Sequence, residues 1–576
     1  MRNYVTGCKL VRGCKEAGIE AFLLLQLLSG YIISCVSFLL GYSLQPWQFW
    51  SSMALSAIAA FIFSKKSAAQ VIAINFVVFV LTMYTFTYVH VDASICHLPV
   101  AHFMLDGWNP VRENSLEAVR AMFASHGMTH VREFSAMHVL VVPKFVHILS
   151  AQLQSASGLF TAAAYPMWAM FFALASAAYK FSRAIWGASV FYACSFAALL
   201  CCNPIIMEHC FTGLVDYVSY ASVVLALLSL VSWDRYARTA DLAVFFASLS
   251  VALVCKFSAL APSVLLLGYM FHISRRERRL RIAALVSLCV FCFMCIIPYW
   301  TSAWWHGSPF YPSHSFRQDA KLMDLTADFI GNDDASKMGY LARFVYAWVS
   351  RPLALWGCRL WHSCNEFMPV WRWDFLASGC DWRYCALIWG SLVAALAFAR
   401  NRVSAAGIVL FSSFFAITTK YIGYPRYVAH VYAAAALLWY NVAYSASKQR
   451  VRTVLLSLCA AASAIVAAEA VCKFLRQVGD ESLRQRNLAV MAASNRPYAP
   501  VESPSWWTYA IERRFRIESL APGGGNEACR FDVEWPLMFA GEGLLKRENV
   551  SLWRTLANWP HPLWDKDEGM NKEPLK

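Results

Sequence analysis

The hydrophobic residues of this chain lie in long runs that recur over most of its length, separated by short polar breaks. As a helix, a mainly apolar run of about 17–22 residues spans the hydrocarbon core of a bilayer. The pattern predicts an all-α polytopic membrane protein with about 13 transmembrane helices. We expect them at residues 20–41, 47–64, 70–88, 158–179, 184–202, 216–232, 241–256, 258–272, 282–300, 383–399, 404–419, 426–444 and 453–472. The seventh and eighth are short and form a tight pair.

Composition supports this fold class. Of the 576 residues, 59% are hydrophobic and 15% are charged, whereas a soluble chain of this length would divide into domains with a more polar surface. The formal net charge is +15, but the basic residues lie in short loops between the apolar runs. This distribution indicates positive-inside topology rather than a nucleic-acid partner.

The basic residues also predict the orientation of the helices. Lys and Arg precede the first predicted helix and follow the even-numbered ones, as in "RRERRLR" (275–281), while "SLQPW" and "CNPIIMEHCFTGL" contain none. This asymmetry places the N-terminus in the cytoplasm and the loops at 88–157 and 301–382 outside. We expect a transmembrane domain at 1–472 and a small periplasmic domain at 473–576. The lack of an ER-retention ending favours a bacterial inner membrane.

Two segments of the first outer loop predict helices that are too short or too polar to span. The apolar residues of "NSLEAVRAMFA" share one helical face: Leu116, Val119, Met122 and Phe123. Asn114 and Glu117 have the spacing of a capping box. "MHVLVVPKFVHILSAQL" is a second apolar-faced segment, interrupted by Pro143. We expect both segments to lie in the interface at the outer surface of the membrane.

Ionisable residues at the ends of the predicted spans are candidates for function, because charge in or beside a membrane is costly. Five of them lie at predicted outer ends: Asp92, Asp216, Lys256, Lys420 and Arg426. An ion transporter more often places acidic groups near the middle of a span, at broken helices. The pattern favours an enzyme that works at the outer membrane surface.

The segment that begins at Asp92 resembles a known family. "DASICHLPVAHFMLDGWNPV" is similar to the first outer loop of the GT-C glycosyltransferases, which are multi-spanning, polyprenyl-phosphate-dependent enzymes in the broad superfamily of the dolichyl-phosphate-mannose–protein mannosyltransferases. The matching positions are Asp92, His97, Leu98, Pro99, Gly107, Trp108, Asn109 and Pro110. Cys96 stands where the family usually has Tyr.

Further segments follow in the order that the family shows. "VVPKFVHIL" resembles its "YPKG" helix, "GLVDY" its "G-x-x-D" helix start and "CKFSAL" its "TKxxxL" element. "GSPFYP" is similar to the "GNPxYP" loop and "YPRYVA" to the late "RYxxP" element, although His430 replaces the usual Pro. The resemblance covers roughly residues 70–445.

The resemblance implies a GT-C fold and the transfer of a sugar, with inversion, from a polyprenyl-phosphate donor to an envelope acceptor, which could be a glycan, a lipid or a protein. A carboxylate at the outer surface suits the general base that such a transfer needs, and this would be Asp92. Lys256 and Arg426 would stabilise the departing phosphate. The other expected substrate-binding residues are His97, Lys144, Asp216, Tyr311 and Tyr427. No cofactor is expected.

Simpler roles stay open for these residues. Asp92 could cap a helix, and Lys144 and Lys256 could snorkel to the interface. Tyr311 could belong to an aromatic belt, and Asp216 could pair with a cation or hold an acceptor. His90 and Asp92 could be half of a divalent metal site, but two ligands do not make one, so no metal is predicted.

Two other functions also stay open. A lipid-linked oligosaccharide flippase could use the same basic contacts to phosphate, but it needs a polar path through to the cytoplasmic face. An O-antigen polymerase-like enzyme also acts outside, although the chain has no single dominant outer loop rich in Arg. The position of the ionisable residues distinguishes an enzyme from a flippase, because an enzyme gathers them in an outward cavity.

Overall fold

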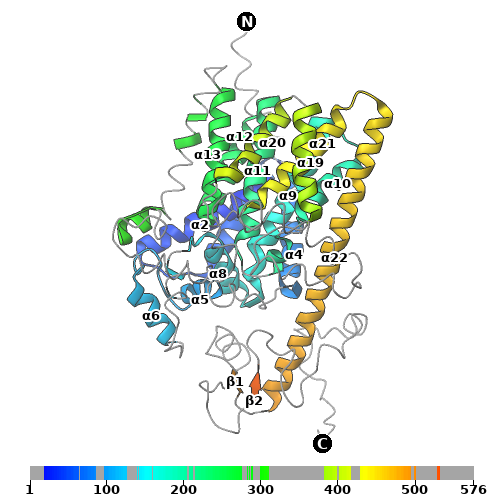
Figure 1. Ribbon diagram of the computed structural model, residues 1–576. Coiled ribbons are helices and arrows are strands. Elements are labelled where there is room, and N and C mark those ends of the chain that lie inside the picture. The colour runs from blue at the N-terminus through cyan, green and yellow to red at the C-terminus, as the bar shows by residue number, and fades with distance from the viewer. Residues whose placement is uncertain are drawn as a thin grey trace, which may run out of the picture.

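The protein was studied as a computed structural model, shown in Figure 1. The structure describes residues 18–63, 65–85, 97–125, 136, 139–140, 142–158, 160–203, 206–211, 214–274, 282, 284–285, 287–289, 299–309, 382–398, 401–416, 428–494, 498–500 and 529–531. This part of the chain is helical apart from two three-residue strands. The predicted all-α class is therefore confirmed.

The predicted transmembrane helices are present wherever their ranges are described. They are α2 (Ile19–Leu40), α3 (Pro46–Phe63), α4 (Lys65–Thr85), α9 (Tyr165–Trp186), α10 (Val190–Cys201), α11 (Asp216–Tyr236), α12 (Thr239–Cys255), α13 (Leu260–Ser274), α19 (Trp382–Phe398), α20 (Arg402–Ala416), α21 (His430–Ser445) and α22 (Gln449–Ser494). The helix expected at 282–300 lies largely outside the described residues.

Length and composition mark this as a multi-pass membrane protein. Within the described residues, six helices are long and apolar enough to cross a membrane: Ile19–Leu40, Lys65–Met83, Ala162–Trp186, Asp216–Tyr236, Phe257–Ser274 and Gln449–Cys472. Shorter apolar helices such as Thr239–Cys255 pack among them. The full count of about 13 spans stays a prediction.

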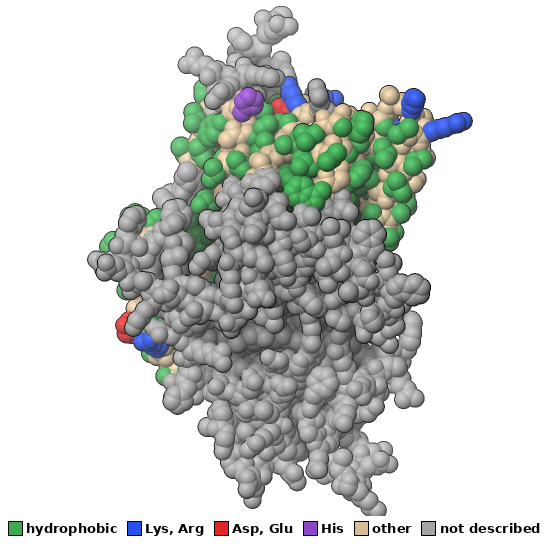
Figure 2. All heavy atoms as spheres, viewed as in Figure 1, with side chains coloured by type: hydrophobic (Ala, Val, Ile, Leu, Met, Phe, Trp, Pro, Cys, Tyr) green, Lys and Arg blue, Asp and Glu red, His purple; other side chains and the backbone are tan. Residues whose placement is uncertain are grey.

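Ion pairs bring the ends of several helices together at one end of the bundle. Lys180 at the end of α9 pairs with Glu20 at the start of α2 at 3.0 Å. Arg402 at the start of α20 pairs with Asp234 at the end of α11 at 2.8 Å. Arg238 and Asp241 pair with each other at the start of α12 at 2.8 Å. We call this the ion-pair end of the bundle. Figure 2 shows Lys and Arg side chains at the upper edge of a band of hydrophobic ones. Which end faces the cytoplasm stays a prediction.

The first short outer helix forms as expected, but its cap differs. α6 (Leu116–Ser125) buries Val119 and Phe123. The expected capping box used Asn114, whereas the structure has the Oγ of Ser115 accepting a hydrogen bond from the backbone N–H of Ala118 at 3.1 Å. The helix thus begins one residue later than the capping-box spacing indicated.

The second short helix does not lie in an interface. α8 (Phe145–Ser157) begins two residues after Pro143, and its residues 145–154 are all buried. It contacts α2, α3 and α5 (Leu98–Leu105). The expectation of a surface helix is wrong for α8, because neighbouring helices cover its polar face as well as its apolar one. Gln152 on that polar face donates to the backbone carbonyl of Gly30 at 2.8 Å.

The last long helix passes the predicted domain boundary at residue 472. α22 contains 46 residues and ends at Ser494, which corresponds to about 69 Å at 1.5 Å per residue. Figure 1 shows it running along the whole bundle towards β1 (Tyr498–Pro500) and β2 (Cys529–Phe531). The two strands pair in parallel, with Tyr498 opposite Cys529.

The buried centre of the bundle is α11, whose membrane-length window is entirely buried. It packs against α9, α12 and α13. Because its last turn lies at the ion-pair end, its first residue, Asp216, lies at the opposite end, which we call the site end. The C-terminus of α2 points to the site end for the same reason.

Candidate functional site

A buried ion pair lies at the site end. Asp216 begins α11, where the positive end of the helix dipole favours a carboxylate, and its side chain is 4% exposed. Lys256 follows α12 in an extended conformation, with φ −156° and ψ 133°, before a 3₁₀ turn at Phe257–Ala259. This break between two helices directs its Nζ to the Oδ1 of Asp216, to which it donates a hydrogen bond.

His209 is the second neighbour of the Asp216 carboxylate. It lies in the 3₁₀ turn η3 (Met207–Phe211), and its Nδ1 is 3.5 Å from the Oδ2 of Asp216. Both carboxylate oxygens thus face a nitrogen-bearing side chain. His209 is not predicted from the sequence, where its one signal is its place in the polar turn before "GLVDY".

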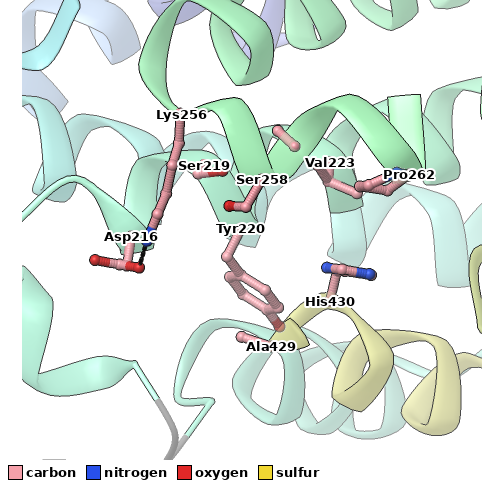
Figure 3. Close-up of a pocket in the computed structure, with 10 residues that line it drawn as sticks. Asp216, Ser219, Tyr220, Val223, Lys256, Ser258, Pro262, Ala429 and His430 are labelled. Carbon is pink, nitrogen blue, oxygen red and sulfur yellow. Dashed lines mark hydrogen bonds and ion pairs between the residues drawn. The ribbon is translucent and has the colours of Figure 1, made fainter. Parts of the chain in front are cut away.

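This ion pair forms one wall of a small pocket, shown in Figure 3. The pocket is narrow, with a cavity volume of about 10 Å³, and it is partly open to the outside. Its lining residues come from α11, the break after α12, α13 and the start of α21: Asp216, Ser219, Tyr220, Val223, Lys256, Ser258, Ala259, Pro262, Ala429 and His430. Polar groups therefore outnumber apolar ones in a buried part of a membrane protein.

Three of the segments noted in the sequence meet in this pocket. "GLVDY" contributes Asp216, "CKFSAL" contributes Lys256 and Ser258, and "YPRYVAH" contributes Ala429 and His430. Asp216 and Lys256 are 40 residues apart in the chain, and His430 lies far beyond both. The Nε2 of His430 is 2.6 Å from the Oγ of Ser413, a contact that fixes the start of α21 against α20.

A second cluster is formed by the first outer loop and α8. The Nδ1 of His97 is 2.9 Å from the Nε2 of His147, and the two rings are stacked with an interplanar angle of 2°. His97 belongs to "HLP" and His147 to "VVPKFVHIL", so two further segments of the resemblance lie together. His147, which the sequence analysis did not select, lies three residues after Lys144 on the same segment.

Lys144 lies beside this cluster. Its ammonium donates to the carbonyl of Leu140 and lies 5.9 Å from the ring centroid of Trp108, within reach of a cation–π interaction. Burial lowers the pKa of Lys144 to about 7. None of the ion pairs among the described residues involves Lys144.

The "GWNP" element fixes the loop to the end of α2. The Nδ2 of Asn109 donates to the carbonyl of Phe38 at 2.8 Å, and its Oδ1 accepts from the backbone N–H groups of Val111 and Arg112. Arg112 donates through Nε to the carbonyl of Leu39 at 3.2 Å. These bonds satisfy carbonyls that the last helical turn leaves open. They hold the second cluster at the site end.

The structure thus places four of the eight predicted site residues, all at the site end. Asp216 and Lys256 lie together in the pocket, and His97 and Lys144 belong to the second cluster. Asp92, Tyr311, Arg426 and Tyr427 lie outside the described residues. Within the described part of the chain, no three His, Cys, Asp or Glu side chains gather as metal ligands would.

Comparisons of the chain with protein-family models, curated proteins and solved structures found no match.

Proposed function

We propose that the protein is an integral membrane glycosyltransferase that moves a sugar from a polyprenyl phosphate to an acceptor of the cell envelope. The observation that carries the proposal is the convergence of the "GLVDY", "CKFSAL" and "YPRYVAH" segments on one polar pocket. A second group, "HLP", "GWNP" and "VVPKFVHIL", meets at the same end of the bundle.

In the proposed reaction, a hydroxyl oxygen of the acceptor attacks the anomeric carbon of the donor sugar. The new glycosidic bond forms as the bond from that carbon to the phosphate oxygen breaks, and the electron pair stays on the departing polyprenyl phosphate. Asp92 accepts the hydroxyl proton. Attack opposite to the leaving group inverts the anomeric centre.

Cations near the departing phosphate stabilise its developing charge. Lys144 suits this role, because none of the ion pairs among the described residues neutralises its ammonium. Arg426 lies four residues before the start of α21 in the chain, in the "YPRYVAH" segment whose Ala429 and His430 line the pocket. Lys256 is less suited to bind phosphate alone, since its charge is balanced by Asp216.

The positions of charged residues favour an enzyme over a flippase. In α11, no charged residue lies between Asp216 and Asp234, and in α12 none follows Asp241 up to Cys255. The described charges on these central helices are therefore restricted to the two ends. A flippase for a charged lipid needs polar groups along its path through the membrane.

The two functions are separated by one experiment with purified protein in proteoliposomes. The vesicles carry undecaprenyl phosphate linked to a labelled monosaccharide, and octyl glycosides serve as acceptors. A glycosyltransferase forms labelled octyl disaccharide and releases undecaprenyl phosphate. Movement of intact labelled lipid between leaflets, without disaccharide over a panel of donor sugars, would support the flippase instead.

A further inference from the structure

The pocket beside Asp216 contains both hydrogen-bond donors and hydrogen-bond acceptors. Lys256 supplies ammonium protons and Asp216 supplies carboxylate oxygens, and they are joined by an ion pair. Ser219 and Ser258 add two hydroxyls, neither of which has a hydrogen-bond partner among the described residues. Figure 3 shows Ser258 and Lys256 on the same side of the pocket as Asp216.

Among the described residues, the charges that line this pocket cancel. Asp216 contributes one negative charge and Lys256 one positive charge, and no other Lys, Arg, Asp or Glu lines the pocket within the described residues. A phosphate placed here would approach a carboxylate that is almost fully buried. The Lys144 cluster has the opposite character, since its ammonium is in none of the ion pairs formed by described residues.

A group that is uncharged and both donates and accepts hydrogen bonds fits these surroundings. Each sugar hydroxyl donates one hydrogen bond and accepts others, so it can donate to a carboxylate oxygen and accept from an ammonium or a serine hydroxyl. Bonds to the charged partners are the stronger ones. Tyr220 adds a buried aromatic surface, and its hydroxyl is already bonded to the carbonyl of Leu200 at 2.8 Å.

We propose that the Asp216–Lys256 pocket binds sugar hydroxyls and that the lipid phosphate binds elsewhere, on the side of Lys144. Asp216 is then a binding group that accepts a hydrogen bond from the sugar, and Lys256 holds the carboxylate in place while donating to a neighbouring hydroxyl. The inference rests on the proposed function and assigns one part of its substrate to one part of the site. The hydroxyls belong either to the donor sugar or to a sugar of the acceptor.

Binding of lipids with and without a sugar tests this division. The dissociation constants of undecaprenyl phosphate and of undecaprenyl-phosphoryl glucose, mannose and arabinose are measured on full-length protein in nanodiscs. Three proteins are compared: wild type, Ser258→Ala and Asp216→Asn. Asp234→Asn is the matched control, because it changes the same residue type on the same helix at the ion-pair end.

For a donor sugar in the pocket, Ser258→Ala weakens binding of the preferred sugar-bearing lipid by about threefold to tenfold, the usual worth of one neutral hydrogen bond. Asp216→Asn weakens it further, and Ser258→Ala does not change the affinity for bare undecaprenyl phosphate. For an acceptor sugar, both variants raise the KM for the octyl glycoside in the transfer assay instead, with donor binding unchanged. The control variant Asp234→Asn matches wild type in both assays.

Two results would overturn the inference. An equal loss of affinity for lipids with and without sugar would make the pocket a phosphate site. Wild-type behaviour of Ser258→Ala and Asp216→Asn in both assays would show that the pocket is not part of the substrate site. Ser258→Ala leaves the ion pair intact, so poor folding of Asp216→Asn does not prevent the test. If the wild-type protein binds none of these lipids, the proposed function fails, which is a different result.

Discussion

Removing both partners of the Asp216–Lys256 pair is expected to destabilise the protein by much less than the sum of the two single removals. Asp216 is 4% exposed and Lys256 is 17% exposed, so either charge left alone stays largely desolvated. At an effective dielectric constant of about 20, two charges about 4 Å apart attract by about 4 kcal/mol. Breaking a buried pair by a single substitution usually costs about 3–5 kcal/mol.

The double variant separates the ion pair from the loss of the individual side chains. Asp216→Asn and Lys256→Met should each lower the free energy of unfolding by about 3 kcal/mol or more, whereas the double variant should lose much less than their sum. The Asp234–Arg402 pair is the control, because Arg402 is 58% exposed. An exposed pair of this kind contributes about 0–1 kcal/mol.

The assay is equilibrium unfolding by SDS in mixed micelles, followed by tryptophan fluorescence on all four proteins of each cycle. A coupling energy of about 2–3 kcal/mol for the buried pair, and one below about 0.5 kcal/mol for the control pair, is the expected result. Additive effects of the two buried substitutions would show that the side chains do not interact in the folded protein.

Three further outcomes follow from particular contacts. Donor affinity should be constant below about pH 7 and fall by up to about tenfold per pH unit above it, because only the protonated form of Lys144 attracts phosphate and burial lowers its pKa to about 7. Lys144→Arg should remove this pH dependence. An unchanged pH profile in that variant would exclude Lys144 as its origin. Ser115→Ala should reduce the free energy of unfolding by about 1 kcal/mol while Ser115→Asp retains it, since the side-chain oxygen caps α6; equal stability of the two would disprove the cap. Spin labels at residues 468 and 486, 18 positions apart on α22, should show a narrow distance distribution near 27 Å, and a broad, shorter distribution would mean that the helix breaks near residue 472.

The transmembrane helices could be predicted from the sequence because a long apolar run has one stable conformation in a bilayer. The end of α22 could not be predicted in this way. Hydropathy falls after residue 472, where the last candidate span ends, but a helix can continue beyond a span where no residue interrupts its backbone. Residues 473–494 contain no Pro and a single Gly, so the helix continues to Ser494.

The sequence predicted some members of the candidate site but not their pairings. Asp216 and Lys256 were selected because charges are rare at the ends of spans, but a partner 40 residues away is determined by helix packing. His209 and His147 were missed for the same reason: the sequence does not show which side chains a histidine will meet once the helices pack. The burial of α8 also depends on helices that surround it in three dimensions.

We propose that the protein transfers a sugar from a polyprenyl phosphate with Asp92 as the base. The most direct measurement is single-turnover transfer of labelled sugar from undecaprenyl phosphate by purified wild type and Asp92→Asn, with donor affinity measured on the same samples. The account predicts that transfer falls by about two to four orders of magnitude in the variant while donor affinity is retained. Transfer at the wild-type rate by Asp92→Asn would contradict it.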